Sequence, residues 1–130
     1  MSLSVTFLES HFFIDQEYQW EALEALAAWA RARQPAETGH WWYLEQELLK
    51  AQTLAEALEM ARWSVTQDSS ANIIGIRYRT DLPFGSWTSD ILEVVAPYVR
   101  PGSFIALLVE TQEIRWDFDG LHARKTVQAW

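Results

Sequence analysis

The sequence contains no cysteine among its 130 residues. Disulfides, thiolate catalysis and cysteine-based zinc sites are therefore excluded together, and the fold must depend on packing. No apolar run approaches the roughly 20 residues that a transmembrane helix needs, and the N-terminus lacks the charged and apolar regions of a secretory signal. We therefore expect a cytoplasmic protein with no membrane partner.

The motifs that carry catalysis and cofactor binding are also missing. The three histidines, His11, His40 and His122, do not stand in H-x-x-x-H or H-E-x-x-H spacing, and no G-x-S-x-G, Walker-type or G-x-G-x-x-G pattern occurs. We therefore expect neither a metal nor another cofactor. The best catalytic pair is Glu9 with His11 on one strand face, where a carboxylate could orient an imidazole as general base, but a third positioned group is lacking. We expect a protein that is not an enzyme.

The whole chain has a formal net charge of -8, and the negative charge is concentrated in its N-terminal half. Residues 1–61 hold ten acidic and three basic side chains, whereas residues 62–130 hold eight and seven. Such an acidic half repels phosphate backbones and attracts basic surfaces, which argues against direct nucleic-acid binding. A solvated surface tuned for solubility is the alternative explanation.

The first third of the chain predicts a strand and a long helix. β-branched and aromatic residues favour a strand over residues 5–14, with all odd positions on one side. Asp15 can then cap a helix that ends before Pro35. Its expected inward stripe has helical spacing and consists of Trp20, Leu23, Ala27 and Ala30.

Two shorter helices and a hairpin should follow. Residues 44–50 continue as a short helix, and Thr53 with Glu56 forms a capping box for a helix from residue 54 to about 62. A hairpin is expected over residues 63–79, with a polar five-residue connection. Its second arm should bury Ile74, Ile76 and Tyr78.

The last third predicts a helix followed by a β-meander. A helix capped by Ser86 or Ser89 should end or kink near Pro97, which cannot donate a backbone hydrogen bond. A central strand over residues 104–109 is then followed by the alternating residues Ile114, Trp116 and Phe118. Asp119-Gly120 predicts a two-residue type I′ turn into a third strand.

This order of elements defines the expected fold class. Helices are few and clustered, and most strands are joined by short hairpins, so we predict an α+β fold with a mainly antiparallel sheet and helices on one face. A ferredoxin-like arrangement is the nearest simple description. Residues 1–130 show no linker or repeat, which predicts a single domain.

The C-terminal segment resembles the ending of small bacterial and phage α+β proteins. The resemblance is carried by A-P-Y-V-R-P-G-S-F-I at residues 96–105, followed by I-R-W-D-F at residues 114–118. It covers about a quarter of the chain and is a folding unit with no ligand residues to transfer. The resemblance implies that the protein acts in a bacterial cell or in a phage-infected host cell.

The leading hypothesis is a non-catalytic inhibitor of the mobile-element type, either anti-CRISPR or another anti-defence protein. Its acidic helical face would block a basic, nucleic-acid-binding surface of a partner protein. A tryptophan that is exposed in the free protein would become buried in the complex and anchor it. The candidate partner-binding residues are the exposed acids and adjacent tryptophans Glu17, Glu21, Glu24, Glu45, Glu47, Trp41 and Trp42.

Three other functions stay open at this point. The first is an immunity protein that neutralises a nuclease-like toxin, which would use the same acidic face. The second is an enzyme or small-ligand protein with a cavity lined by Trp20, Trp63 and Trp116 and with Glu9 and His11 as polar groups. The third is an accessory subunit that forms a homodimer through a tryptophan-rich surface, so the expected state is monomer or homodimer.

Overall fold

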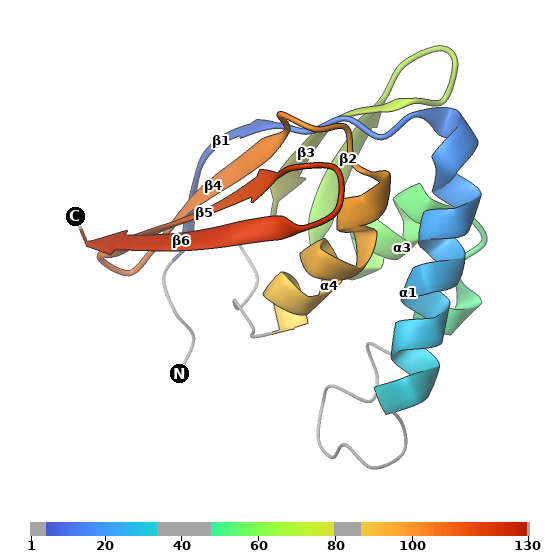
Figure 1. Ribbon diagram of the computed structural model, residues 1–130, viewed down its shortest axis with the longest axis horizontal. Coiled ribbons are helices and arrows are strands. Elements are labelled where there is room, and N and C mark those ends of the chain that lie inside the picture. The colour runs from blue at the N-terminus through green and yellow to red at the C-terminus, as the bar shows by residue number, and fades with distance from the viewer. Residues whose placement is uncertain (1–4, 34–47, 80–86, 130) are drawn as a thin grey trace.

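The computed structural model describes residues 5–33, 48–79 and 87–129 (Figure 1). The strands are β1 (Val5–His11), β2 (Trp63–Gln67), β3 (Ile73–Tyr78), β4 (Phe104–Val109), β5 (Gln112–Phe118) and β6 (Ala123–Ala129). The helices are the 3-10 turn η1 (Gln16–Tyr18), α1 (Gln19–Arg33), α3 (Leu54–Met60), α4 (Trp87–Val95) and the 3-10 turn η2 (Ala96–Tyr98).

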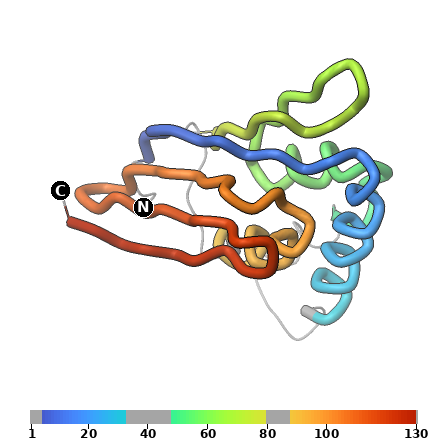
Figure 2. The backbone as a smooth tube through the Cα atoms, turned by 45° about the horizontal axis from the view of Figure 1, so that its top comes forward, coloured from blue at the N-terminus to red at the C-terminus, as the bar shows by residue number. Residues whose placement is uncertain are grey.

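The strands form a four-stranded sheet in the order β1-β4-β5-β6 and a two-stranded sheet of β2 and β3, and all pairings are antiparallel. The two sheets meet where Ile14 and Ile73 exchange backbone hydrogen bonds of 2.9 and 3.0 Å. The hydroxyl of Ser10 also donates to the carbonyl of Ile76. In space β1 therefore lies between β4 and the β2-β3 hairpin, as Figure 2 shows.

This arrangement is an α+β fold built on the ferredoxin-like order. From β1 to β4 the chain runs strand, helices, strand, strand, helix, strand, and in space the order is β2-β3-β1-β4. Strands β5 and β6 extend the sheet beyond β4 as the expected meander. Helices α1, α3 and α4 lie together on one side of the strands (Figure 1).

A single cluster of buried side chains joins both sheets to the helices. The alternation predicted for β5 is confirmed, because Ile114, Trp116 and Phe118 are all buried. The fully buried Trp63 packs edge-on against Tyr78, with ring centroids 4.9 Å apart. Burial raises the pKa of the Tyr78 hydroxyl.

Two β-bulges change which residues face the core. In β1 the register shifts between Phe7 and Glu9, so Phe7 pairs with Leu107 whereas His11 pairs with Phe104, on the opposite face. The expectation that all odd positions of this strand share one side is therefore wrong. In the β2-β3 hairpin a second shift follows Thr66.

The second bulge corrects the face predicted for β3. Ile76 and Tyr78 are buried as expected, but Ile74 is exposed and Ile73 is buried in its place. An inserted residue reverses the alternation at that point, because side chains point to opposite faces at successive positions of a strand.

The start of α3 and the end of α4 follow the predicted local chemistry, whereas the predicted cap Asp15 makes no side-chain cap hydrogen bond. The Thr53 hydroxyl accepts a hydrogen bond from the backbone N–H of Glu56 at 3.1 Å, and the Glu56 carboxylate accepts one from Gln52 at 2.8 Å. The predicted Thr53 cap of α3 is therefore confirmed, and the return bond to Glu56 comes from the residue before the cap. Helix α4 stops at Val95 and continues as a 3-10 turn through Pro97. Ser89 lies inside α4 and is not its cap, and Ser86 lies outside the described residues.

The turn between β5 and β6 is longer than predicted. It covers Asp119 to His122, and only Gly120 has a positive φ, of 96°, so the two-residue type I′ turn is not formed. The Asp119 carboxylate instead accepts hydrogen bonds from the backbone N–H groups of Leu121 and His122, at 2.9 and 2.7 Å. These bonds lower the pKa of Asp119, with the bond from His122 as the largest cause.

Candidate functional site

The acidic residues predicted at the start of the first helix lie on one exposed face. Glu17 belongs to η1, and Glu21 and Glu24 belong to α1, and all three are exposed. Together with Trp20 they stand at the spacing i, i+3, i+4 and i+7, which places four side chains along one side of a helix. Among the described residues no ion pair is formed by these three carboxylates.

Trp20 lies on this acidic face and not in the core. Its side chain is 65 % exposed, whereas the inward side of α1 is formed by Ala22, Leu23, Leu26 and Ala30. At about 100° per residue, Trp20 lies about 160° around the helix from Ala22 but only about 60° from Leu23, so it stands at the border between the inward side and the acidic face. The prediction that Trp20 belongs to the core stripe is therefore wrong. Tyr18, which is 42 % exposed, adds a second aromatic ring to this end of the helix.

The remaining predicted binding residues cannot be placed. Trp41, Trp42, Glu45 and Glu47 all lie outside the described residues. The described part of the proposed surface is the segment from Glu17 to Glu24, which we call the acidic face.

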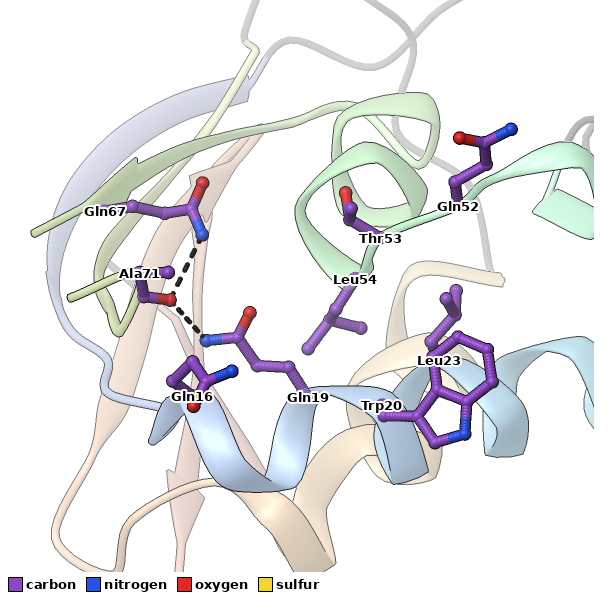
Figure 3. Close-up of a pocket in the computed structure, with 9 residues that line it drawn as sticks. All are labelled: Gln16, Gln19, Trp20, Leu23, Gln52, Thr53, Leu54, Gln67 and Ala71. Carbon is purple, nitrogen blue, oxygen red and sulfur yellow. Dashed lines mark hydrogen bonds between the residues drawn. The ribbon is translucent and has the colours of Figure 1, made fainter. Parts of the chain in front are cut away.

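A pocket of about 270 Å³ adjoins the acidic face (Figure 3). Three separate segments line it: the start of α1, the start of α3 and the turn between β2 and β3. Its lining side chains are Gln16, Gln19, Trp20, Leu23, Gln52, Thr53, Leu54, Gln67 and Ala71. The pocket thus combines four amides with an exposed indole and an apolar floor, and no charged side chain lines it.

The amides of Gln19 and Gln67 have fixed orientations. Both amide nitrogens donate to the carbonyl oxygen of Ala71, at 2.7 and 3.2 Å. A carbonyl can only accept, so the nitrogen of each amide must face Ala71 and the oxygen must face away. Figure 3 shows both side-chain oxygens on the side turned away from this carbonyl. Among the described residues neither oxygen accepts a hydrogen bond, so both remain available as acceptors on side chains that line the pocket.

The turn that carries Ala71 is held by the carboxylate of Asp68. It accepts hydrogen bonds from the backbone of Ser70 and from both the backbone and the side chain of Asn72, at 2.9 to 3.0 Å. These bonds lower the pKa of Asp68, with the Asn72 side chain as the largest cause. Asn72 in turn accepts from the backbone N–H of Gln16 at 2.8 Å, so the turn is fastened to the start of the helix.

The alternative cavity of three tryptophans is not formed. Trp63 and Trp116 are 0 and 1 % exposed, which leaves no space beside them for a molecule of the size of water, and Trp20 lies at the surface. The prediction of a cavity lined by these three rings is wrong, because two of them fill the core.

Glu9 and His11 do share a face, the one opposite to the helices. Their register partners are Ala106 and Phe104, and the imidazole stacks on the Phe104 ring with centroids 6.4 Å apart. Within the described ranges no hydrogen bond joins the two side chains or orients the imidazole. The third group that catalysis would require is not supplied by the described residues.

Sequence reasoning did not find the pocket. Glutamine belongs to no catalytic or metal-binding motif, and the lining residues come from three separate segments between residues 16 and 71. The only local signal was the cluster of Gln16 and Gln19 around a helix start.

Comparison with known proteins gives no family. No protein-family model matches the chain, and neither a curated protein nor a solved structure matches it. Among the described helices none is long and apolar enough to cross a bilayer. The fold and the acidic face therefore carry the functional argument by themselves.

Proposed function

We propose that this protein is a non-catalytic inhibitor of the mobile-element type that binds a basic surface of a partner protein. The acidic face would cover a surface that the partner uses for nucleic acid, as an anti-CRISPR or other anti-defence protein would. The observation that supports it most strongly is Trp20, a large ring that is 65 % exposed and has a carboxylate at positions i-3, i+1 and i+4.

The carboxylates and the ring would serve different steps of binding. Exposed ion pairs contribute little affinity, typically less than about 1 kcal/mol each, but they increase the rate of encounter with an oppositely charged surface. Two like-charged pairs at i, i+3 and i, i+4 also cost the free helix about 0.2–0.5 kcal/mol each. We infer that these acids serve association with a partner.

The ring would supply most of the affinity. An aromatic side chain of this size can bury up to about 250 Å², so covering the exposed part of Trp20 would remove roughly 160 Å² from water. At about 25 cal/mol per Å² this corresponds to ~4 kcal/mol before ordering costs, which is the range of an interface hot spot.

The proposal is tested in bacteria that carry an active CRISPR system and are plated with a targeted phage. We expect expression of the protein to restore plaque formation with at least one effector in a panel. The triple variant Glu17→Lys, Glu21→Lys, Glu24→Lys should lose this activity. Restoration by that variant at the wild-type level, or no restoration with any effector, would count against the proposal.

A matched control separates the acidic face from net charge. Glu9→Lys, Asp90→Lys and Glu110→Lys change the formal charge by the same amount at exposed positions outside the acidic face, on β1, on α4 and in the turn between β4 and β5. This control variant should restore plaques as well as the wild type does. If it also loses activity, the acidic face has no special role.

The immunity-protein alternative shares the acidic face and differs in the partner. It predicts that the protein protects cells from a co-expressed nuclease toxin and leaves CRISPR interference unchanged. The homodimer alternative predicts a dimer in light scattering, and the small-ligand alternative now lacks its cavity of three tryptophans.

A further inference from the structure

We propose that the pocket between α1, α3 and the β2-β3 turn receives an arginine side chain of the partner. This inference rests on the proposed function, because it identifies the chemical group that the acidic face brings to the protein. The negative charge of the acidic face does not by itself determine which chemical group enters the pocket beside it.

The hydrogen-bonding groups of the pocket favour a ligand that donates. The side-chain oxygens of Gln19 and Gln67 are turned away from Ala71 because their nitrogens are both used there. The pocket therefore offers acceptors to a ligand that carries several N–H donors. A guanidinium group has five such donors in one plane and no acceptor, which matches this arrangement.

The ring of Trp20 provides a surface on which a guanidinium can lie. Elsewhere in the described chain, arginine stacks on an aromatic ring in three places, with the guanidinium carbon 3.8, 4.2 and 4.8 Å from the ring centroid of Phe13, Phe104 and Phe7. The ring of Trp20 carries no such group from the described residues, yet it borders the pocket. Tryptophan provides the strongest cation–π surface of the aromatic side chains.

The apolar surface of the pocket and the charges around it also suit an arginine side chain. Leu23 and Leu54 form an apolar floor on which the methylene stem of arginine can pack. No carboxylate lines the pocket, so a bare metal ion would lack its preferred ligands. The carboxylates of Glu17 and Glu21 flank Trp20 on the helix and supply a negative field without occupying the pocket.

The arrangement also favours arginine over lysine. Lysine carries a compact, strongly hydrated charge, which loses more hydration in a pocket lined by neutral amides. Arginine is less strongly hydrated and can stack and donate along its edge at the same time. A preference for arginine is therefore the distinguishing property of this site.

The test is an NMR titration of the ¹⁵N-labelled protein with N-acetyl-L-arginine amide. We expect saturable shifts of the Trp20 indole N–H and of the Gln19 and Gln67 side-chain amides, with a dissociation constant on the order of 1 mM. N-acetyl-L-lysine amide should bind at least about tenfold more weakly. Absence of saturable shifts at these three groups, or equal binding of the lysine compound, would overturn the assignment.

Variants of the lining residues provide the control. Gln67→Met keeps the side-chain length but removes the acceptor, and Trp20→Leu removes the stacking surface, so each should weaken arginine binding by at least about fivefold. Gln128→Met makes the same chemical change at an exposed position on β6 and should leave binding unchanged. Wild-type binding by Gln67→Met and Trp20→Leu would refute the proposal even if both fold normally.

The outcome for the pocket can be separated from the outcome for the acidic face. If charge reversal of the acidic face abolishes plaque restoration while Gln67→Met retains it, the pocket assignment fails and the proposed function stands. If the pocket binds arginine but no effector is inhibited, the proposed function fails and the arginine site stands.

Discussion

Replacing Trp20 by Ala should change the stability of the protein far less than replacing Trp116 by Ala. Both residues are tryptophans with an apolar surface of the same size. Trp20 is 65 % exposed on α1, however, whereas Trp116 is 1 % exposed in the middle of the sheet. The comparison therefore measures directly whether Trp20 is a surface residue.

The expected magnitude follows from the covered part of each ring. About a third of Trp20 is buried, or roughly 90 Å² of a ring that can bury up to about 250 Å², so its removal costs ~2 kcal/mol at about 25 cal/mol per Å². Alanine returns about 0.5 kcal/mol because it is the better helix former. The net loss for Trp20→Ala is about 1.5 kcal/mol, against about 3–5 kcal/mol for a fully buried tryptophan.

Urea denaturation followed by far-UV circular dichroism measures both losses. We expect Trp20→Ala to unfold cooperatively, with an unchanged slope against urea and a midpoint only slightly below that of the wild type. A loss of about 3 kcal/mol or more in Trp20→Ala would show that this ring packs in the core, and the acidic face would lose its anchor.

Two further predictions concern turns. Gly102→Ala should lower the free energy of unfolding by about 1–2 kcal/mol, because the φ of +93° at this position disfavours any side chain. No atom lies within 4 Å of the added methyl group, so the loss would come from the backbone alone. Gly75→Ala in β3 should leave the stability unchanged, and equal melting temperatures of the two variants would contradict this prediction. The lowered pKa of Asp119 means that its stabilising contribution is present above the ordinary value of 3.8 and is lost as pH falls below it. The melting temperature of Asp119→Asn should therefore fall less between about pH 5 and pH 2 than that of the wild type, and parallel curves would argue against the turn bonds.

The secondary structure was predictable where local chemistry decides it. Thr53 and Glu56 specify the start of α3 through bonds within one turn, and Pro97 ends α4 because it has no backbone N–H. Alternation of large apolar and charged residues likewise marked β5 as a half-buried strand. These signals act over a few residues, so no knowledge of tertiary contacts is needed.

The faces of the strands were not fully predictable. A β-bulge depends on how two strands pair, and the sequence of one strand does not record it. The register shift after Phe7 therefore placed Glu9 and His11 on the open face of the sheet, opposite to Phe7.

The candidate site was predictable only in part. The acids of the first helix were visible as a charge pattern, and the structure places the described ones on one exposed face. The exposed position of Trp20 was not predictable from the sequence. Helical periodicity alone assigns an apolar residue near an apolar stripe to the core, but the Trp20 side chain is turned toward solvent. The pocket depends on three segments that only the fold brings together.

The most direct test of the central claim is the association rate with the effector that the plaque assay identifies, measured at about 50 mM and about 200 mM salt. If the acidic face guides binding, the association rate of the wild type and of the control triple variant should fall steeply with added salt. The variant with Glu17, Glu21 and Glu24 changed to Lys should associate slowly at both salt concentrations. A rate that is the same for all three proteins, with the same salt dependence, would contradict the claim that this face meets the partner.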